Sequence, residues 1–232
     1  MVTVRPAGER GHRDLGWLDT RHTFSFGDYH DPAHMGFGPL RAINEGVLAP
    51  GAGFPPHTHH DAEIVTWVLE GELEHRDSLG HASTLRRGLL QVLTAGTGLE
   101  HSAGNHSARL PVHLLQIWLR PDRPGHRPAC GQCHLPLPER QDRLRLAVSA
   151  DGEDGSLRWH ADARLWVAEL GADVTVEHVL GPGRRAWLQV TSGRVSVNAV
   201  GLAAGDGAAI DDVARLDLAA DGECALLLFE LP

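Results

Sequence analysis

The stretch His57-Thr58-His59-His60-Asp61-Ala62-Glu63-Ile64-Val65-Thr66-Trp67-Val68-Leu69 carries one signal for a metal site and one for a buried strand. His57 and His59 are two residues apart, so on a strand their side chains point to the same face. Residues 64–69 are rich in β-branched side chains and apolar on both faces, which is typical of a strand buried in a sandwich or barrel. The stretch therefore predicts β-structure that presents paired imidazoles.

The rest of the chain shows short apolar runs separated by Gly, Pro and Asp, with little helical periodicity. Residues 110–119 and 225–231 have the length and composition of further strands. Regular turn signals between short strands are typical of a β-sandwich or barrel. We therefore expect an all-β fold.

A second histidine motif follows the first. His101 lies 42 residues after His59, and Glu63 lies four residues after His59. Neutral imidazoles that converge on one face suit Fe, Mn, Ni, Cu or Zn. Glycines accompany both motifs, at Gly51, Gly71, Gly88 and Gly96. This two-part arrangement resembles the paired metal motifs of the cupin superfamily, and it predicts that His57, His59 and His101 bind a metal ion. Surface histidines in a loop are the alternative interpretation.

Length and composition narrow the class of protein. The 232 residues suffice for one large or two small domains, and the hydrophobic content of 42% is ordinary for a globular protein. All 21 basic residues are Arg, scattered in ones and twos, and the net charge is −9, which argues against nucleic-acid binding. No signal peptide and no run long enough to span a bilayer is recognisable. We expect a cytoplasmic protein that binds neither nucleic acid nor membrane.

The three cysteines, Cys130, Cys133 and Cys224, do not predict a disulfide framework, because their number is odd and no export signal is present. Cys130-Gly131-Gln132-Cys133-His134 matches the spacing of covalent haem attachment, an export-side chemistry that we discount. Half a zinc site, a redox pair and a chance match are the alternatives. Chance is the favoured one.

Prolines, arginines and aspartates concentrate between the two halves of the chain. We expect residues 1–122 to form an N-terminal metal-binding domain, residues 123–143 a linker, and residues 144–232 a C-terminal domain. Of the 16 histidines, all but two lie at or before His134, so metal chemistry belongs to the first domain.

The second half echoes the first. Residues 187–195 repeat the pattern of residues 65–73, and a gapless alignment of the halves places His57 opposite Val179. An internal duplication is therefore expected, with a degenerate second copy that is structural.

Several strings resemble the pirin family, in particular its bacterial quercetinase-like branch. They are His22-Thr23-Phe24-Ser25-Phe26, Gly53-Phe54-Pro55-Pro56-His57-Thr58-His59, Leu69-Glu70-Gly71-Glu72-Leu73-Glu74-His75-Arg76-Asp77-Ser78 and Thr94-Ala95-Gly96-Thr97-Gly98. The resemblance implies two cupin β-barrels of the jelly-roll type in tandem, a bicupin. It also implies one divalent transition metal in the amino-terminal barrel, with iron(II) as the leading candidate and Ni, Mn, Cu or Zn as alternatives. A monomer is expected.

One position departs from the family pattern. The family's fourth ligand is a glutamate two residues after the second-motif histidine, where this chain has Ala103. Glu63 is a candidate catalytic base, and it could ligate the metal if the chain turns back at residues 60–62. Without that turn, a strand would place Glu63 about 13 Å from His59. Glu100 and a water or hydroxide are the other candidates for the open position.

The resemblance implies a metal-dependent oxygenase that cleaves flavonols such as quercetin with dioxygen. The expected partners are a small aromatic, flavonol-like substrate and dioxygen. Phe24, Phe26 and Trp118 are candidates for an apolar pocket wall, with core packing as the alternative for each. A second hypothesis, favoured slightly by Ala103, is a metal- or redox-sensing regulatory protein that acts through a protein partner.

Overall fold

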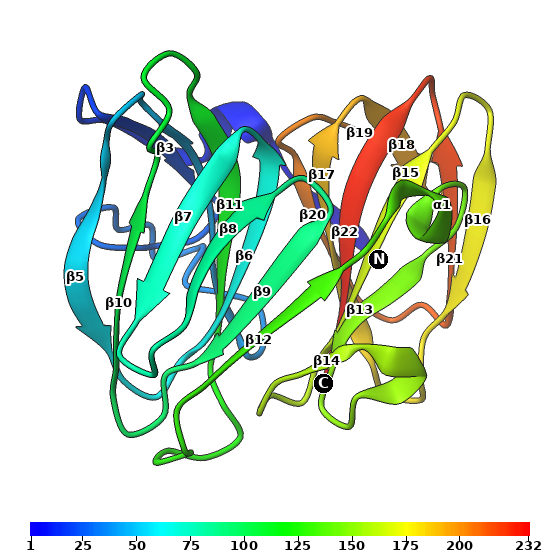
Figure 1. Ribbon diagram of the computed structural model, residues 1–232. Coiled ribbons are helices and arrows are strands. Elements are labelled where there is room, and N and C mark those ends of the chain that lie inside the picture. Colours follow the sequence, from blue (N-terminus) through cyan, green and yellow to red (C-terminus); the bar gives the residue numbers. More distant parts are fainter. The chain divides into compact units, whose positions relative to one another are not determined.

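A computed structural model describes residues 1–232 and is almost entirely β-structure, as the sequence predicts. Helical turns are confined to one short α-helix, α1 (Leu137–Arg140), and the 3-10 turns Ala7–Glu9 and Glu153–Gly155. The chain divides into two compact units (Figure 1). The N-terminal unit comprises Gly11–His134 and Leu157–Ala161, and the C-terminal unit comprises Met1–Arg10, Leu135–Ser156 and Asp162–Pro232. No helix has the length and apolar character needed to cross a bilayer.

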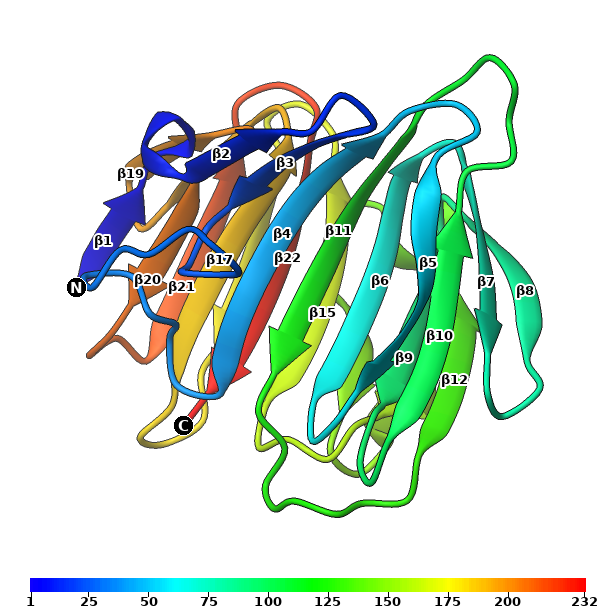
Figure 2. The same cartoon turned by 90° about the vertical axis from the view of Figure 1, so that its left-hand side faces the viewer.

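The N-terminal unit contains two antiparallel sheets. The larger sheet has the strand order β12-β9-β6-β11-β4-β3-β2, and the smaller has the order β5-β10-β7-β8 (Figure 2). The bounds are β2 (Gly11–Asp14), β3 (Leu18–His22), β4 (Leu40–Leu48), β5 (Gly53–His59), β6 (Glu63–Glu70), β7 (Glu72–Asp77), β8 (Ala82–Arg86), β9 (Leu89–Thr94), β10 (Leu99–Gly104), β11 (Val112–Leu119), β12 (Ala129–His134) and β14 (Leu157–Arg158).

The C-terminal unit repeats this plan. Its larger sheet has the order β1-β20-β17-β22-β15-β13, and its smaller sheet has the order β16-β21-β18-β19. The bounds are β1 (Val2–Arg5), β13 (Arg145–Ser149), β15 (Arg164–Leu170), β16 (Thr175–Val179), β17 (Arg185–Ser192), β18 (Arg194–Val197), β19 (Val200–Ala203), β20 (Gly207–Ile210), β21 (Arg215–Ala220) and β22 (Cys224–Leu231).

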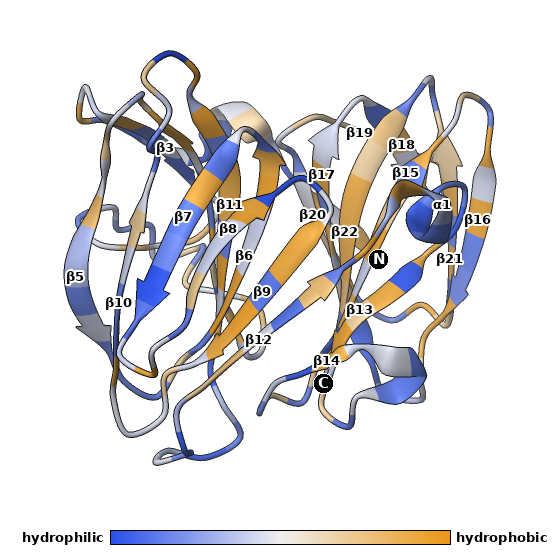
Figure 3. Ribbon diagram, in the orientation of Figure 1, coloured by the Kyte–Doolittle hydropathy of each residue, from blue (hydrophilic) through white to orange (hydrophobic).

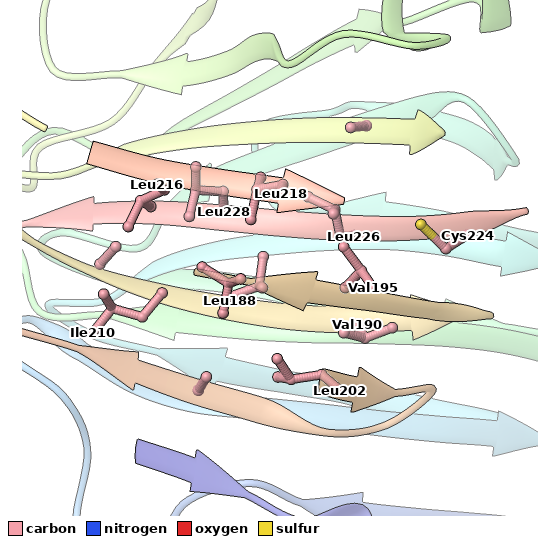
Figure 4. Packing of buried hydrophobic residues seen from close by; sticks show 14 of the residues in the cluster. Leu188, Val190, Val195, Leu202, Ile210, Leu216, Leu218, Cys224, Leu226 and Leu228 are labelled. Atoms are coloured by element: carbon pink, nitrogen blue, oxygen red, sulfur yellow. The ribbon is translucent and has the colours of Figure 1, made fainter. Parts of the chain in front are cut away.

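Both units bury an apolar core between their sheets. β6 lies between β9 and β11 and is buried from Glu63 to Val68, which explains why this strand is apolar on both faces. The core of the C-terminal unit gathers side chains from both of its sheets, among them Leu188, Val195 and Leu226 (Figure 4). The hydropathy colouring shows the same apolar strands, with β9 and β22 strongly hydrophobic (Figure 3).

The two compact units do not follow the expected domain boundaries. Strand β1 pairs with β20, so the first ten residues belong to the C-terminal unit rather than to the N-terminal one. Residues 123–143, expected as a linker, contain β12 and α1, and β12 pairs with β9 in the N-terminal unit. The prolines on both sides of β12 made this segment resemble a linker, although it forms a short strand whose partner, β9, is distant in the sequence.

Candidate metal centre

Three histidines converge within the N-terminal unit. His57 and His59 are on β5 and His101 is on β10, and the antiparallel register places His57 directly opposite His101. Because His57 and His59 are two residues apart on one strand, both project to the same face as His101. The sequence prediction that these three residues share a face agrees with this arrangement.

The imidazole rings are close enough to share one cation. Ring centroids lie 4.6 Å apart for His57 and His59, 4.6 Å for His57 and His101, and 4.9 Å for His59 and His101. The Nε2 atoms of His59 and His101 are 3.0 Å apart. One potential ligand atom from each residue lies within 4.8 Å of the other two.

Hydrogen bonding selects the nitrogen of His57 that is free to ligate. Its Nδ1–H donates to the carbonyl oxygen of Pro55 at 2.7 Å, which leaves the Nε2 lone pair available. Such a bond fixes the tautomer and the ring orientation of a ligating imidazole. The hydrogen bond to Pro55 therefore leaves Nε2 as the atom of His57 that can bind a metal.

Burial keeps the other two imidazoles neutral. Burial, with the nearby His57 and His60, lowers the pKa of His59 to about 4. Burial, with the neighbouring histidines, lowers the pKa of His101 to about 3. Only a neutral imidazole has a lone pair to offer a metal. The Nδ1 atom of His101 is buried without a hydrogen-bond partner.

The donor set fits a borderline divalent transition metal. Three neutral nitrogen donors suit Fe, Ni, Mn, Cu or Zn and do not suit Ca²⁺ or Mg²⁺, which prefer oxygen. The Nε2 atoms of His59 and His101 are close enough to bind the same cation. The residues present therefore fit a metal, with further coordination positions that no histidine fills.

Aromatic side chains line one side of this centre. Trp118 packs edge-on against His59 with centroids 4.7 Å apart, and Phe26 packs edge-on against Trp118 at 5.3 Å. Phe26 also lines a cavity of about 410 Å³ together with His22 and Tyr29. Phe24 is 2% exposed and belongs to the buried core.

Glu63 lies outside the group of three histidines. It is fully buried at the start of β6, and its Oε2 accepts a hydrogen bond from the Thr94 hydroxyl at 2.8 Å. Burial raises the pKa of Glu63 to about 7, against hydrogen bonds from Thr94 and the His160 backbone. Its other oxygen has no partner. The cluster of potential ligand atoms formed by His57, His59 and His101 does not include Glu63.

Ala103 occupies an apolar position. It is 6% exposed and packs in a hydrophobic cluster with Phe54, Leu73 and Leu85. Ala103 is two residues after His101 on β10, so both side chains project to the same face. A methyl group therefore stands on the ligand face, and this position offers no donor to the metal.

The C-terminal unit has lost this centre. Strand β21 pairs with β16 and β18 as β10 pairs with β5 and β7. Matching these two sets of pairings places Leu216 at the position of His101. His178, which pairs with Leu216, therefore takes the position of His57. The gapless alignment, which placed Val179 there, is wrong by one residue. Leucines stand in place of the other two ligands, at Leu180 and Leu216.

In this unit His178 hydrogen-bonds a buried carboxyl group. Its Nε2 lies 3.2 Å from Oε2 of Glu230, which is 2% exposed. Burial opposes ionisation of Glu230, but His178, Arg184 and Arg164 together hold the pKa of this carboxyl below its ordinary value. Sequence reasoning missed this cluster, since no motif spacing connects its members.

Comparison with known proteins covers the whole chain. The family model described as Pirin matches residues 3–119, and the one described as Quercetinase C-terminal cupin domain matches residues 146–231. A quercetin 2,3-dioxygenase of Escherichia coli (strain K12) is 42% identical over 232 residues, covering 100% of this chain and 99% of the relative. A pirin-like protein of Caulobacter vibrioides is 36% identical over 231 residues, covering 99% of each chain.

Solved structures of pirin-family proteins are similar to this chain over its whole length. The crystal structure of YhhW from Escherichia coli superposes with a TM-score of 0.96 at 42% identity, covering 100% of this chain and 98% of that one. The structure of bacterial pirin YhhW in complex with nickel(II) gives a TM-score of 0.95 at 43% identity, covering 100% and 99%. These likenesses confirm the expected fold of two cupin domains.

Proposed function

Because the chain belongs to the pirin family of two-domain cupins, we propose that it is a metal-dependent oxygenase that cleaves flavonols with dioxygen. His57, His59 and His101 hold one divalent transition metal in this proposal. The observation that carries it is the convergence of three imidazoles in one place, with the pKa values of His59 and His101 lowered by burial. The quercetin 2,3-dioxygenase relative supports the reaction type.

The bound metal would act as a Lewis acid that acidifies a flavonol hydroxyl and brings the substrate and dioxygen together. The protein's own part is to hold three nitrogens and to keep the surroundings dry. Trp118 shields one edge of His59, and Phe26 extends that apolar wall. A planar aromatic substrate fits a wall made of rings in edge-on contact.

Proton transfer is the step in which this chain departs from its family's pattern. Ala103 has no carboxylate to accept the proton of a flavonol hydroxyl, and such a base has to lie within hydrogen-bond reach. Glu63 enters the proposal as a group that holds a proton, since its pKa of about 7 suits that role. Its hydrogen bond to Thr94 places it in the large sheet. With the three histidines holding the metal, solvent at the open position would be left as the base next to the substrate.

The metal is proposed to be iron(II) or nickel(II). Nickel(II) is the ion in the YhhW complex, and three imidazoles accept both ions. A site of three neutral ligands leaves the positive charge of the metal uncompensated, which disfavours a trivalent state. We therefore expect the divalent form to persist in air longer than in a site that has a carboxylate.

The test is oxygen uptake with quercetin by protein reloaded with each metal. We expect uptake that depends on the metal and is lost in His101→Ala. The matched control is His106→Ala, because His106 is on the exposed loop after β10, where its side chain is 66% exposed and pairs with Glu74. Uptake that survives in His101→Ala would contradict the proposed metal mechanism. One bound metal without uptake of oxygen would instead support the sensing alternative, which the relatives do not favour.

A further inference from the structure

We propose a second metal site in the N-terminal unit, formed by His75, Asp77 and Cys130, for a thiophilic divalent cation such as zinc(II). One potential ligand atom from each of these residues lies within 4.8 Å of the other two. None of them belongs to the group of His57, His59 and His101. The inference does not depend on the oxygenase activity.

Both sheets of the unit contribute to this second site. His75 and Asp77 are two residues apart on β7, so their side chains project to the same face. Cys130 comes from β12, in the other sheet. The side chain of His75 is 2% exposed and that of Asp77 is not exposed at all. The side chains of His75 and Asp77 therefore lie in the interior, where an unpaired charge would be costly, and the partly buried Cys130 reaches them from the other sheet.

The contacts centre on the carboxylate of Asp77. The Nε2 atom of His75 lies 3.0 Å from Oδ2 of Asp77, and the thiol of Cys130 hydrogen-bonds the same carboxyl group. Tetrahedral zinc holds nitrogen and oxygen at about 2.0 Å and sulfur at about 2.3 Å, so its ligands are roughly 3.3–3.7 Å from one another. A small contraction or expansion of the observed contacts reaches that geometry.

A fourth donor stands at the solvent side of the site. The Nδ1 atom of His81 lies 3.1 Å from Oδ2 of Asp77, and the His81 side chain is 49% exposed. His81 or a water can therefore complete four-coordination and gives an ion a route in from solvent. Gln91 donates to the sulfur of Cys130 at 3.6 Å, the outer contact that orients a ligating thiolate.

The chemistry of the donors distinguishes the two sites. Nitrogen, oxygen and thiolate sulfur together are a zinc-type set, whereas the first site has nitrogen alone. The sites are neighbours, since Asp77 pairs with His101 and His75 with Ala103 across β7 and β10. The His75 and His101 ring centroids are 5.5 Å apart. A cation in one site would therefore interact electrostatically with a cation in the other.

The site is tested by titrating the metal-free full chain with cobalt(II) and recording its absorption spectrum. A thiolate ligand gives an intense charge-transfer band in the near ultraviolet, which a site of three imidazoles lacks. We expect about two equivalents bound by the native chain, with the band present, and about one equivalent without the band in Cys130→Ser. Cys133→Ser, on the same strand, should keep both.

His57→Ala separates this inference from the proposed function. It should lose one equivalent of cobalt(II) and retain the thiolate band, so failure of the first site leaves the second measurable. If Cys130→Ser does not fold, alkylation of the native chain replaces it. Zinc(II) should then slow the alkylation of Cys130 at least about tenfold and leave Cys133 unaffected. A thiolate band that persists in Cys130→Ser, or alkylation that is indifferent to zinc(II), would overturn the proposal.

Discussion

His75 lies directly across from Ala103 on the neighbouring strands β7 and β10. Side chains of directly opposed residues on antiparallel strands lie on one face, about 5 Å apart. Ala103 shares that face with His101, two residues earlier on β10. A longer side chain at position 103 would consequently reach toward the imidazoles of His75 and His101. The effect of a carboxylate at this position can therefore be tested by substitution.

Ala103→Glu should strengthen metal binding by the first site. An added carboxylate supplies a charged oxygen donor beside His101, and we expect the dissociation constant for nickel(II) to fall by at least about tenfold. Without metal the same substitution should destabilise the chain by about 1–3 kcal/mol, because it buries a carboxyl in an apolar cluster. Calorimetric titration and chemical unfolding measure the two effects.

Ser102→Glu is the control for this substitution. Ser102 is the neighbour of Ala103 on β10, so its side chain projects to the opposite face. Nickel(II) affinity equal to that of the native chain is expected for Ser102→Glu. Equal gains in both variants would show that net charge, and not ligation, produced the effect.

Glu63→Gln should make stability less dependent on pH. The pKa of Glu63 rises from 4.5 to about 7 on folding, chiefly through burial. The folded chain therefore binds this proton more tightly than the unfolded chain, and the native protein loses stability as pH rises between those two values. Glutamine carries no such charge. The variant should gain up to about 3 kcal/mol relative to the native chain on going from pH 5 to pH 8.

Urea unfolding at several pH values measures the Glu63 effect. Glu72→Gln serves as control, since Glu72 is exposed at the start of β7. Its unfolding free energy should keep the native pH profile. A Glu63→Gln profile parallel to that of the native chain would show that the buried carboxyl stays ionised throughout.

Gly96→Ala should severely destabilise the N-terminal unit. Gly96 has φ of +46°, and an added Cβ would lie 1.9 Å from the carbonyl oxygen of His126. We expect a loss of at least about 3 kcal/mol, because the backbone has to move. Gly125→Ala is the matched control, with φ of +75° and nothing within 4 Å of the added atom. It should lose only about 1 kcal/mol. Thermal unfolding compares the two.

Glu230→Ala should destabilise the C-terminal unit by about 3–5 kcal/mol. Removing this buried carboxylate leaves His178 and Arg184 without their shared partner. Asp162→Ala, which removes an exposed partner of Arg184, should cost less than about 1 kcal/mol. Neither change should alter metal content, which elemental analysis checks. Equal costs for the two variants would mean that the buried cluster contributes no more than a surface ion pair.

Local pattern accounts for much of the candidate site. The i, i+2 spacing of His57 and His59 makes them share a face on any strand, and the structure places them on β5. His101 was found through its motif, because its pairing with His57 across β5 and β10 depends on the register of two strands whose paired histidines are 44 residues apart along the chain. The role of Glu63 did not follow from spacing, since its environment comes from Thr94 and His160.

Strand pairing also decided where the units begin and end. The linker expected over residues 123–143 contains β12, and the amino terminus pairs with β20. Composition around a short strand reports flexibility and turn tendency, but it carries no information on the partner that satisfies the backbone hydrogen bonds. The same limit explains the misplacement of Val179 opposite His57, which the strand register assigns to His178.

The sequence by itself determined the all-β class and the family, and it identified His57, His59 and His101 as candidate ligands. The spacing of two that makes His57 and His59 share a face is a local property, whereas His101 was identified from its motif. Tertiary structure alone decided what surrounds them. It placed Cys130 beside His75 and Asp77 from a different sheet, and it isolated Glu63 in the interior with a raised pKa. Those relationships arise when distant strands pack against one another, since burial and proximity are set by the fold as a whole.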